Sequence, residues 1–417
     1  MTTGWTTSSL ADLLTERDVR AGAVAEDYEV LSLTKRMGLI PQRDRFTKRV
    51  ATEDISEYKV VEPGWIAYNP FVLWEGAIHA LRRLTPGVVS PAYAVWERNE
   101  DDGGYLDHVL RSPALIARYE SLAAGAVNRR RTVKKQDFLE ISLLCPPLDE
   151  QLRIATVLNS LQRAVALQEA VLQSATELKQ ALLTSLFTVG ARSEALRDTE
   201  LGLRPDSWKV QPLAAIAKLA SGGTPSRSKP EYWEGGSIPW VKTGEVNNDV
   251  IAETSECITQ AGLDNSSAKK FPPGTLLMAM YGQGITRGRV ALLGLEAATN
   301  QACVAIFPSE VLLSEFLFYL FQARYEEFRS RGHGANQPNL SAEILKSVLI
   351  AYPADTDEQQ DIVRTLASVD ERIRAAALER DLLNELYSGV LDAAVAGDVR
   401  VSTEAVEALT RVTGTGK

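Results

Sequence analysis

The feature that most constrains the fold of this chain is an internal repeat. The segment CPPLDEQLRIATVLNSLQ, which begins at Cys145, returns as PADTDEQQDIVRTLASVD, which begins at Pro353. Matched residues differ by a constant 208 in number, so that 149–151 (Asp-Glu-Gln) corresponds to 357–359 without a gap. Fainter matches precede both copies. The chain therefore has to be understood as a tandem duplication of one structural unit.

Each copy continues into a long stretch with a heptad-like spacing of apolar residues, beginning at Ile154 and at Ile362. The further members are Leu158, Leu161, Val165, Leu172, Ala175, Leu182 and Leu186, then Leu366, Val369, Ile373, Ala376, Leu383, Tyr387, Val390 and Ala394. Neither stretch contains proline, and Gly190 and Gly397 stand where a helix is expected to end. The spacing predicts two helices of roughly 37 residues, about 55 Å long, that pack against one another.

The sequence ahead of each helix predicts a globular unit with both strands and helices. Short strand-like runs, SIPWVKTGEV, TLLMAMYG and CVAIFPS, are separated by Gly, Pro, Ser and Thr. A helix is predicted at 312–331. Trp5 and Trp208 occupy parallel places at the start of the two units. The predicted fold class is α/β (mixed), with two globular domains separated by two long helices that form an antiparallel coiled coil.

The repeat also predicts where the segments begin and end. They are, in order, a globular unit, a central helix, a linker, a second globular unit, a C-terminal helix and a C-terminal tail: 1–146, 147–190, 191–206, 207–353, 354–397 and 398–417. A chain of 417 residues is long enough for two to four domains, and a hydrophobic content of 45% is enough for their cores.

The charge of the chain is unusual for a protein that binds nucleic acid by itself. The net charge is −9, whereas compact DNA-binding domains are usually basic. The acidic residues concentrate in 149–200 and 354–409, whereas 35–49 carries six basic residues against one acidic residue, and 128–135 carries five against none. If the chain binds DNA, we expect strong binding only beside a partner that adds positive charge.

Several classes of protein are disfavoured. There is no run of about 20 apolar residues and no signal-peptide pattern, so we expect a cytoplasmic protein. The three cysteines are scattered in apolar surroundings, which favours reduced, buried thiols. His79, His108 and His333 form no metal-ligand spacing with them, and no catalytic residues or metal site are predicted.

Two short motifs suggest chemistry but depart from the patterns that chemistry needs. Tyr68-Asn69-Pro70-Phe71 lacks the second proline of an adenine methyltransferase tetrapeptide, and no glycine-rich cofactor loop precedes it. We interpret it as a strand that ends in a turn. The glycine-rich run 281–288 (YGQGITRG) has the spacing neither of a dinucleotide fingerprint nor of a P-loop. It suits either a DNA-contacting loop or a plain hairpin loop.

The junctions between globular units and helices carry a resemblance to a known family. Residues 336–341 (NQPNLS) lead through EILKSVLIAYP into 357–359 and a long helix, and 141–151 (ISLLCPPLDEQ) enters the first helix in the same way. Further matches are SGGTP at 221–225, Tyr232-Trp233, IPW at 238–240 and SPAY at 90–93. In this order the segments resemble the specificity subunits of Type I restriction-modification enzymes over nearly the whole chain.

The resemblance implies that each globular domain is a target recognition domain, reading half of a split DNA site through the major groove, and that the helices are spacers. It implies double-stranded DNA and two methylation subunits as partners, with restriction/translocase subunits as a further set. S-adenosylmethionine is then expected on the methylation subunits and no cofactor in this chain. The duplication adds independent support, because protein symmetry mirrors site symmetry. The first half lacks the Gly-x-x-Pro-x-x-Trp segment of 202–208, and Pro147 has no counterpart.

Basic and polar residues in loops are the candidates for DNA contacts, because Arg pairs with guanine, Asn or Gln with adenine, and Lys or Ser with phosphate. The candidates in the first domain are Arg43, Arg45, Lys48, Arg49, Arg129, Arg130 and Arg131. In the second they are Thr224, Ser226, Arg227, Lys229, Lys242, Gln283, Arg287, Arg289, Asn336 and Gln337. The main alternative function is a non-catalytic coiled-coil scaffold whose globular domains bind protein. A single-chain methyltransferase would need the missing cofactor loop.

Overall fold

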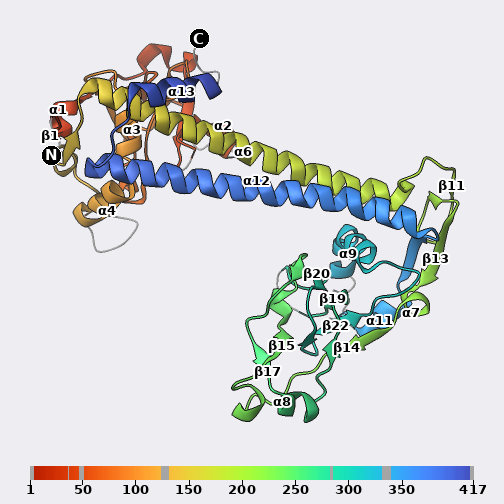
Figure 1. Ribbon diagram of the computed structural model, residues 1–417. Coiled ribbons are helices and arrows are strands. Elements are labelled where there is room, and N and C mark those ends of the chain that lie inside the picture. Colours follow the sequence, from red (N-terminus) through yellow and green to blue (C-terminus); the bar gives the residue numbers. More distant parts are fainter. Residues whose placement is uncertain are drawn as a thin grey trace. The chain divides into compact units, whose positions relative to one another are not determined.

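A computed structural model of the protein describes residues 4–35, 37–46, 51–123, 131–281, 285–330 and 340–413. The chain divides into two units, each with one globular domain and part of both long helices (Figure 1). Unit 1 consists of Met1–Glu169 and Ala377–Lys417, and unit 2 of Ala170–Ala376. Unit 1 therefore holds the beginning of the first long helix together with the end of the second.

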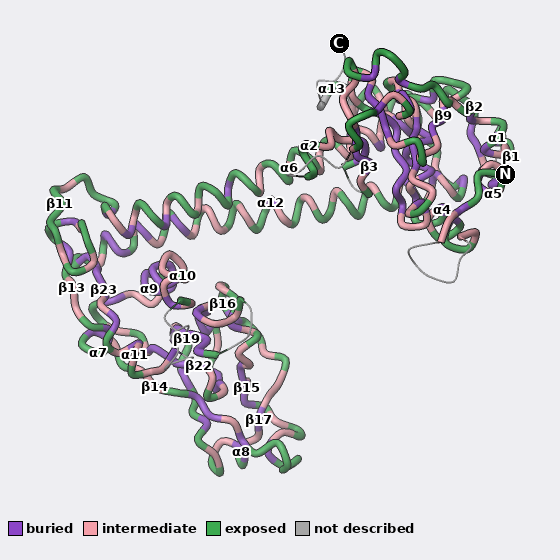
Figure 2. The backbone as a smooth tube through the Cα atoms, turned by 180° about the vertical axis from the view of Figure 1, so that it is seen from behind, coloured by how far each residue is buried: buried purple, intermediate pink, exposed green. Residues whose placement is uncertain are grey.

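The two long helices are α6 (Leu148–Val189) and α12 (Thr356–Ala396), and they pair antiparallel in each unit. In unit 1, Gln162 donates to the hydroxyl of Tyr387 (3.0 Å), and further along α6 Gln168 contacts Glu379. The two helices therefore run in opposite directions. In unit 2, Lys179 of α6 forms an ion pair of 2.7 Å with Asp370 of α12. Buried and exposed residues alternate along both helices (Figure 2).

The apolar seam differs from its prediction at one end. Leu158 and Leu366 are fully buried as predicted. At the end of α6, however, Leu183 and Phe187 are buried, while the predicted Leu182 and Leu186 are only partly buried. This end of α6 packs on the globular domain of unit 2 as well as on α12. The ring of Phe187, for example, meets that of Phe316 edge-on, with centroids 5.2 Å apart.

Glycine ends both long helices, as predicted. Gly190 and Gly397 follow the last helical residues with φ of +77° and +79°, a left-handed conformation that side chains disfavour. Both also lie against neighbours. A Cβ at Gly190 would lie 2.8 Å from the carboxylate of Glu358, and one at Gly397 would lie 2.7 Å from the side chain of Leu144. The left-handed backbone conformation therefore favours glycine at both positions, and the close side-chain neighbours add a smaller constraint.

A two-stranded ribbon connects each globular domain to its long helix. In unit 1, β1 (Thr6–Ser9) pairs antiparallel with β10 (Ser142–Cys145). In unit 2, β13 (Trp208–Pro212) pairs antiparallel with β23 (Leu349–Pro353). Each ribbon leads directly into a helix, α6 or α12, so the duplication read from the sequence is present as repeated structure.

A buried tryptophan–glutamate pair repeats beside each ribbon. The indole of Trp5 donates to Glu150 (3.0 Å), and that of Trp208 donates to Glu358 (3.4 Å). Each glutamate also binds the segment that follows the other long helix. Glu358 accepts from the backbone of Ala191 (3.0 Å), and Glu150 lies 3.5 Å from Arg400. In each unit, therefore, the segment that follows one long helix contacts the glutamate beside the ribbon at the start of the other long helix.

Two four-stranded sheets form the core of the globular domain in unit 1, with strand orders β2-β9-β6-β7 and β4-β3-β8-β5. The strands are β2 (Leu14–Glu16), β3 (Glu29–Leu33), β4 (Leu39–Pro41), β5 (Lys59–Val61), β6 (Ile66–Tyr68), β7 (Ile78–Ala80), β8 (Gly87–Val89) and β9 (Ala94–Arg98). The helices are α1 (Leu10–Leu13), α2 (Gln42–Arg45), α3 (Tyr105–Val109), α4 (Pro113–Leu122) and α5 (Lys135–Leu139). All neighbouring strands pair antiparallel except β3 and β8, which are parallel.

The domain of unit 2 has a five-stranded sheet, β14-β22-β19-β20-β16, and a four-stranded sheet, β17-β15-β21-β18. The strands are β14 (Leu219–Ser221), β15 (Ile238–Val241), β16 (Val250–Ile251), β17 (Cys257–Ile258), β18 (Lys270–Phe271), β19 (Leu276–Ala279), β20 (Val290–Leu293), β21 (Ala297–Thr299) and β22 (Cys303–Ile306). The helices are α7 (Leu213–Ile216), α8 (Gln260–Asp264), α9 (Ser314–Ala323), α10 (Tyr325–Ser330) and α11 (Ala342–Ser347). Parallel and antiparallel pairs coexist, so the predicted mixed α/β class is confirmed.

Three segments differ in detail from the sequence prediction. The single helix predicted at 312–331 is two helices, α9 and α10, because Arg324 leaves helical geometry (φ −100°, ψ 15°) while its guanidinium binds the carbonyl of Leu349 (2.7 Å). The predicted linker holds a short hairpin of β11 (Leu196–Arg197) and β12 (Arg204–Pro205). The predicted tail holds helix α13 (Thr403–Thr413).

The three thiols are free, as predicted, although burial holds for only two of them. Cys145 and Cys303 are buried, and burial raises the pKa of both thiols, whereas Cys257 is half-buried. Within the described ranges, no helix is both long and apolar enough to cross a membrane.

Candidate nucleic-acid interface

Two tryptophans support a cationic surface in the domain of unit 2. The indole of Trp240, in β15, donates to the carbonyl of Gly223 (3.0 Å). Trp233 meets Trp240 edge-on, with centroids 5.0 Å apart, and donates to the carbonyl of Ser226 (3.1 Å). Both bonds hold the loop 222–229 against the rings. This loop carries four of the residues that the sequence proposes for DNA contact.

Arg227 and Lys242 share one carboxylate above these rings. The guanidinium of Arg227 lies 3.6 Å from the ring centroid of Trp233 and forms a 2.6 Å ion pair with Glu256. Lys242, which follows β15, forms a 3.2 Å ion pair with the other oxygen of Glu256. We call these five side chains (Arg227, Trp233, Trp240, Lys242 and Glu256) the tryptophan platform. β15 and β17 lie at the end of unit 2 farthest from its long helices (Figure 1).

The remaining candidates near the platform make local hydrogen bonds. Lys229 donates to the hydroxyl of Tyr232 (2.9 Å), and the hydroxyls of Ser226 and Ser228 lie 2.9 Å apart. The hydroxyl of Thr224 contacts the side-chain oxygen of Gln301. The structure thus brings Thr224, Ser226, Arg227, Lys229 and Lys242 into one part of the domain.

The glycine-rich loop belongs to the other sheet. It joins β19 to β20, which pair antiparallel and so form a hairpin. One amino group of Arg287 donates to the carbonyl of Arg329 in α10 (3.1 Å), and Arg289 contacts Asn247. Both arginines thus contact residues of their own domain. Gln283, Asn336 and Gln337 lie outside the described residues.

The structure does not gather the candidates of the first domain at one place. Arg43 and Arg45 lie on α2, where Arg43 pairs with Glu29 (2.8 Å) and Arg45 donates to the carbonyl of Leu33 (2.8 Å). Arg131 instead donates to the carbonyl of Glu120 in α4 (2.9 Å). Helices α2 and α4 lie on different sides of unit 1 in both views (Figures 1 and 2). Lys48, Arg49, Arg129 and Arg130 lie outside the described residues.

One arrangement nevertheless occurs in both domains. The guanidinium of Arg131 lies 5.0 Å from the ring centroid of Trp74, as that of Arg227 lies over Trp233. Sequence reasoning selected both arginines but missed the tryptophans beneath them and missed Glu256. Tyr232-Trp233 and Trp240 stood out in the sequence only as family signatures. Their contact with Arg227 was not predicted.

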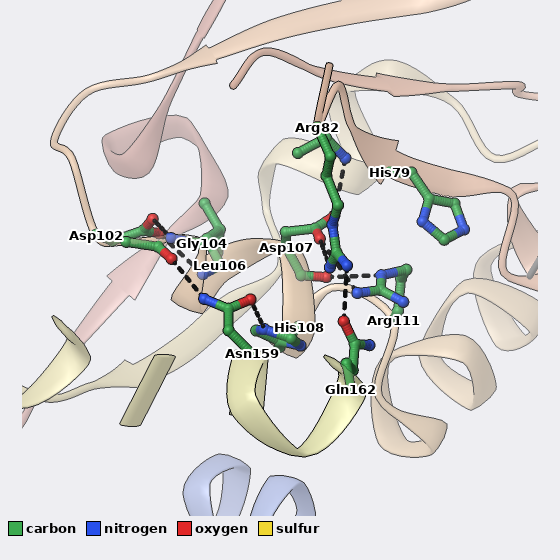
Figure 3. Close-up of polar contacts among 12 residues, drawn as sticks. His79, Arg82, Asp102, Gly104, Leu106, Asp107, His108, Arg111, Asn159 and Gln162 are labelled. Atoms are coloured by element: carbon green, nitrogen blue, oxygen red, sulfur yellow. Dashed lines mark hydrogen bonds and ion pairs between the residues drawn. The ribbon is translucent and has the colours of Figure 1, made fainter. Parts of the chain in front are cut away.

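A buried polar network holds the first domain to the long helices of unit 1 (Figure 3). Asp107 accepts from the backbone of Ala80 (2.8 Å) and from Arg82 (2.6 Å) and Arg111 (3.1 Å). Burial alone would raise the pKa of Asp107, but the two guanidiniums outweigh it and hold the pKa well below the usual range. Arg82 also donates to Gln162 of α6 (2.7 Å).

His108 joins the first domain to both long helices. Its ring nitrogens lie 3.0 Å from the hydroxyl of Tyr387 in α12 and 3.0 Å from the side-chain oxygen of Asn159 in α6. A neutral imidazole that donates to the Asn159 oxygen and accepts from the Tyr387 hydroxyl satisfies both contacts. Burial, reinforced by the nearby Arg111, lowers the pKa of His108 to about 4. These contacts hold the first domain against both long helices.

The motifs that suggested catalysis have structural explanations. Asn69 follows strand β6, and its side chain accepts from the backbone of Phe71 (3.1 Å), which is the predicted turn. Across the described ranges, no three His, Cys, Asp or Glu side chains are grouped as a metal site would require.

Comparison with known proteins gives the second domain a family. A family model described as the Type I restriction modification DNA specificity domain matches residues 205–387. This range contains the tryptophan platform and most of α12. The specificity subunit of Type I restriction enzyme MjaIX from Methanocaldococcus jannaschii is 32% identical over 207 residues, which cover 48% of this chain and 47% of that one. Residues 205–387 therefore belong to the family of Type I restriction modification DNA specificity domains.

Further specificity subunits are similar to the chain. That of EcoR124I/EcoR124II from Escherichia coli is 26% identical over 50% of this chain and 53% of the relative. That of MjaVIII from M. jannaschii is 24% identical over 79% of each. The matches to MjaIX and EcoR124I/EcoR124II thus span about half the length of these relatives.

Solved structures of S subunits share the fold. The crystal structure of the S subunit from M. genitalium covers 93% of this chain, with a TM-score of 0.59 and 12% identity. A chain from a structural study of complex assembly and conformational transition in the type I R-M system covers 95%, with a TM-score of 0.54 and 19% identity. At these identities the similarity concerns the fold alone. It agrees with the architecture of two domains and two long helices.

Proposed function

We propose that this chain is the sequence-specific DNA-recognition subunit of a Type I restriction-modification complex and that it reads a target split into two halves. The observation that carries the proposal is the duplication itself, because one chain holds two copies of a domain, a ribbon and a long helix. Two similar readers in one chain suit two half-sites, just as dimeric readers suit palindromic sites. The chain itself performs no chemistry in this proposal.

The arginine–tryptophan pairs supply chemistry that suits DNA. An arginine fork can bind two acceptors of guanine or of a phosphate, and a flat ring beneath it restricts its orientation. The guanidinium of Arg227 lies over the ring of Trp233, and that of Arg131 lies over the ring of Trp74. Lys229, Lys242 and the hydroxyls of Thr224 and Ser226 are suited to phosphate, which positions a reader without specifying sequence.

The long helices would set the separation of the two readers. Both are free of proline and end at glycine, and polar contacts such as that of Gln162 with Tyr387 tie them to one another. Each ribbon leads directly into one long helix, and the glutamate beside it contacts the segment that follows the other long helix. A change in the length of the helices would therefore be transmitted to both domains.

Partners are proposed from charge and from exposed apolar residues. Leu378, Leu382 and Leu386 recur every four residues on α12 and are 62%, 55% and 54% exposed. A stripe of this kind suits a partner helix. We propose that two methylation subunits dock along the helix pair, that they carry S-adenosylmethionine, and that restriction subunits join them. They would also supply the positive charge that a chain of net charge −9 lacks.

The test is a DNA titration with and without the methylation subunits. The isolated chain is expected to bind duplexes weakly and with a salt dependence set by few phosphate contacts. The complete complex is expected to prefer its target to a scrambled duplex by a factor of about a thousand or more. Measuring each affinity at several salt concentrations separates phosphate contacts from base contacts.

The same titration separates this function from a scaffold. A coiled-coil scaffold whose domains bind protein would assemble with the methylation subunits and yet give equal affinity for target and scrambled duplexes. That result would contradict the proposed function.

A further inference from the structure

We propose that Glu256 is an internal competitor of DNA phosphate: it neutralises Arg227 and Lys242 in the DNA-free protein and thereby limits binding to non-target DNA. This inference rests on the proposed function and names a residue that sets its specificity. It was not among the candidates chosen from the sequence, because an acidic residue is not expected to contact DNA.

The carboxylate of Glu256 pairs with both cations at once. One oxygen of Glu256 lies 2.6 Å from a terminal nitrogen of Arg227, and the other lies 3.2 Å from the ammonium of Lys242. The side chain of Glu256 is 28% exposed, whereas those of Arg227 and Lys242 are 53% and 41% exposed. The cations therefore face solvent more than the carboxylate that neutralises them, and an incoming phosphate can reach both.

The backbone of Glu256 is held in place by its neighbours. Its carbonyl accepts from the backbone of Trp240 (3.0 Å) and from the hydroxyl of Thr254 (2.8 Å). The next residue, Cys257, begins β17 and is paired with Pro239 of β15. The backbone of Glu256 is thus fixed beside β15, which keeps its side chain within reach of Arg227 and Lys242.

Arg227 has contacts that hold it in place without the carboxylate. Its guanidinium lies 3.6 Å from the ring centroid of Trp233 and 5.0 Å from that of Trp240. Stacking on aromatic rings holds a guanidinium independently of an ion pair. Removing the charge of Glu256 should therefore release two cations and leave the platform in place.

The charge relationships then give the functional consequence. The charges of Arg227 and Lys242 beside it hold the pKa of Glu256 below its usual range, so the carboxylate is ionised at neutral pH. Carboxylate and phosphate use the same donors of arginine and lysine. DNA must therefore displace or share these contacts. Base contacts offset that cost on the target but not on other sequences, and specificity is the difference.

The experiment compares Glu256→Gln with a matched control in the complete complex with methylation subunits. The control is Glu296→Gln, which removes the same charge from the same domain, where Glu296 pairs with Lys270, a residue that is not among the candidates for DNA contact. Two affinities are measured across salt concentrations. One is for a duplex that contains the sequence motif that the complex methylates, and the other is for a scrambled duplex. E256Q is expected to bind the scrambled duplex roughly 3- to 10-fold more tightly at low salt, with a log–log salt slope steeper by one to two.

E256Q is expected to discriminate less between the target and the scrambled duplex, because its affinity for the target should rise less than its affinity for the scrambled duplex. E296Q should resemble the unmodified complex. Equal effects of E256Q and E296Q would show a general charge effect and overturn the proposal. Weaker binding of both duplexes by E256Q would overturn it too, because Glu256 would then only position Arg227.

A second variant keeps the test decisive if E256Q does not fold. Glu256→Asp keeps the charge on a side chain one methylene shorter, which is expected to reach only one of the two cations. The affinity of the Glu256→Asp complex for the scrambled duplex should lie between those of the unmodified and E256Q complexes. If E256Q cannot be measured, the Glu256→Asp complex should still bind the scrambled duplex more tightly than the unmodified complex does. An unchanged value would overturn the proposal. Failure of the proposed function itself looks different, because the unmodified complex would then show no preference for its target.

Discussion

At the scale of single residues, the two described histidines predict how stability depends on pH. His79 and His108 are both buried, and burial is the main reason that the pKa of each is lowered to about 4 from 6.5. As pH falls from 6.5 toward 4, the unfolded chain takes up protons that the folded chain does not. The folded state therefore loses stability in this window, by at most roughly 3 kcal/mol per histidine.

His108→Gln tests this prediction. Glutamine can still donate to Asn159 and does not titrate, so the variant should lose less stability than the unmodified protein between pH 7.5 and pH 5. Urea unfolding at several pH values, followed by a signal from unit 1, measures the difference. His79→Gln should also lose less stability than the unmodified protein. Equal losses of stability on acidification in the unmodified protein and in both variants would contradict the lowered pKa values.

Residue type and loop position were enough to select candidates but not to rank them. Arg45 and Arg287 satisfy the same criteria as Arg227, yet they donate to backbone carbonyls of their own domains. Glu256 could not be found in this way, because the pairing of β15 with β17 brings it to Arg227 from 29 positions along the chain. Contacts made through strand pairing leave no local pattern in the sequence.

At the scale of elements, the helix pair predicts the spacing of the DNA target. Inserting seven residues into both helices, after Gln168 in α6 and before Glu379 in α12, keeps the seam in phase and lengthens the pair by about 10 Å. DNA advances about 3.4 Å per base pair, so the unspecified gap should widen by roughly three base pairs. The half-site sequences should stay the same, because no loop of either domain is touched.

The measurement is the preferred gap length among targets with a library of spacers, scored by methylation. Insertion into α6 alone is the control, and it should abolish activity because the two helices can no longer stay in register. An unchanged preferred gap in the double insertion would contradict a spacing role for the helices.

Elements set by local pattern were predicted well, and those set by packing were not. Heptad spacing, absence of proline and a terminal glycine determined α6 and α12 from the sequence. The buried positions at the end of α6 were misassigned by one residue, because Phe187 packs against Phe316 of the globular domain as well as the helix seam. The break between α9 and α10 likewise depends on the contact of Arg324 with Leu349.

At the scale of the whole molecule, the duplication explains most of the organisation. It predicted two domains, two helices and their order, and it recurs in the structure as the Trp5–Glu150 and Trp208–Glu358 pairs. What it leaves open is which surface of each domain reads DNA. The two copies have diverged there, since the first domain has Arg131 on Trp74 but no counterpart of Glu256 among the contacts described.

The most direct test of two independent readers is the methylation motif that the complex produces. Genome-wide methylation mapping is carried out with the unmodified chain, with Arg131→Ala and with Arg227→Ala, each beside the same methylation subunits. The unmodified chain should give a split motif, and each variant should make a different half degenerate, at a cost of about 1–3 kcal/mol per lost base contact. A continuous motif, or degeneracy of both halves from either single variant, would contradict the two-reader account.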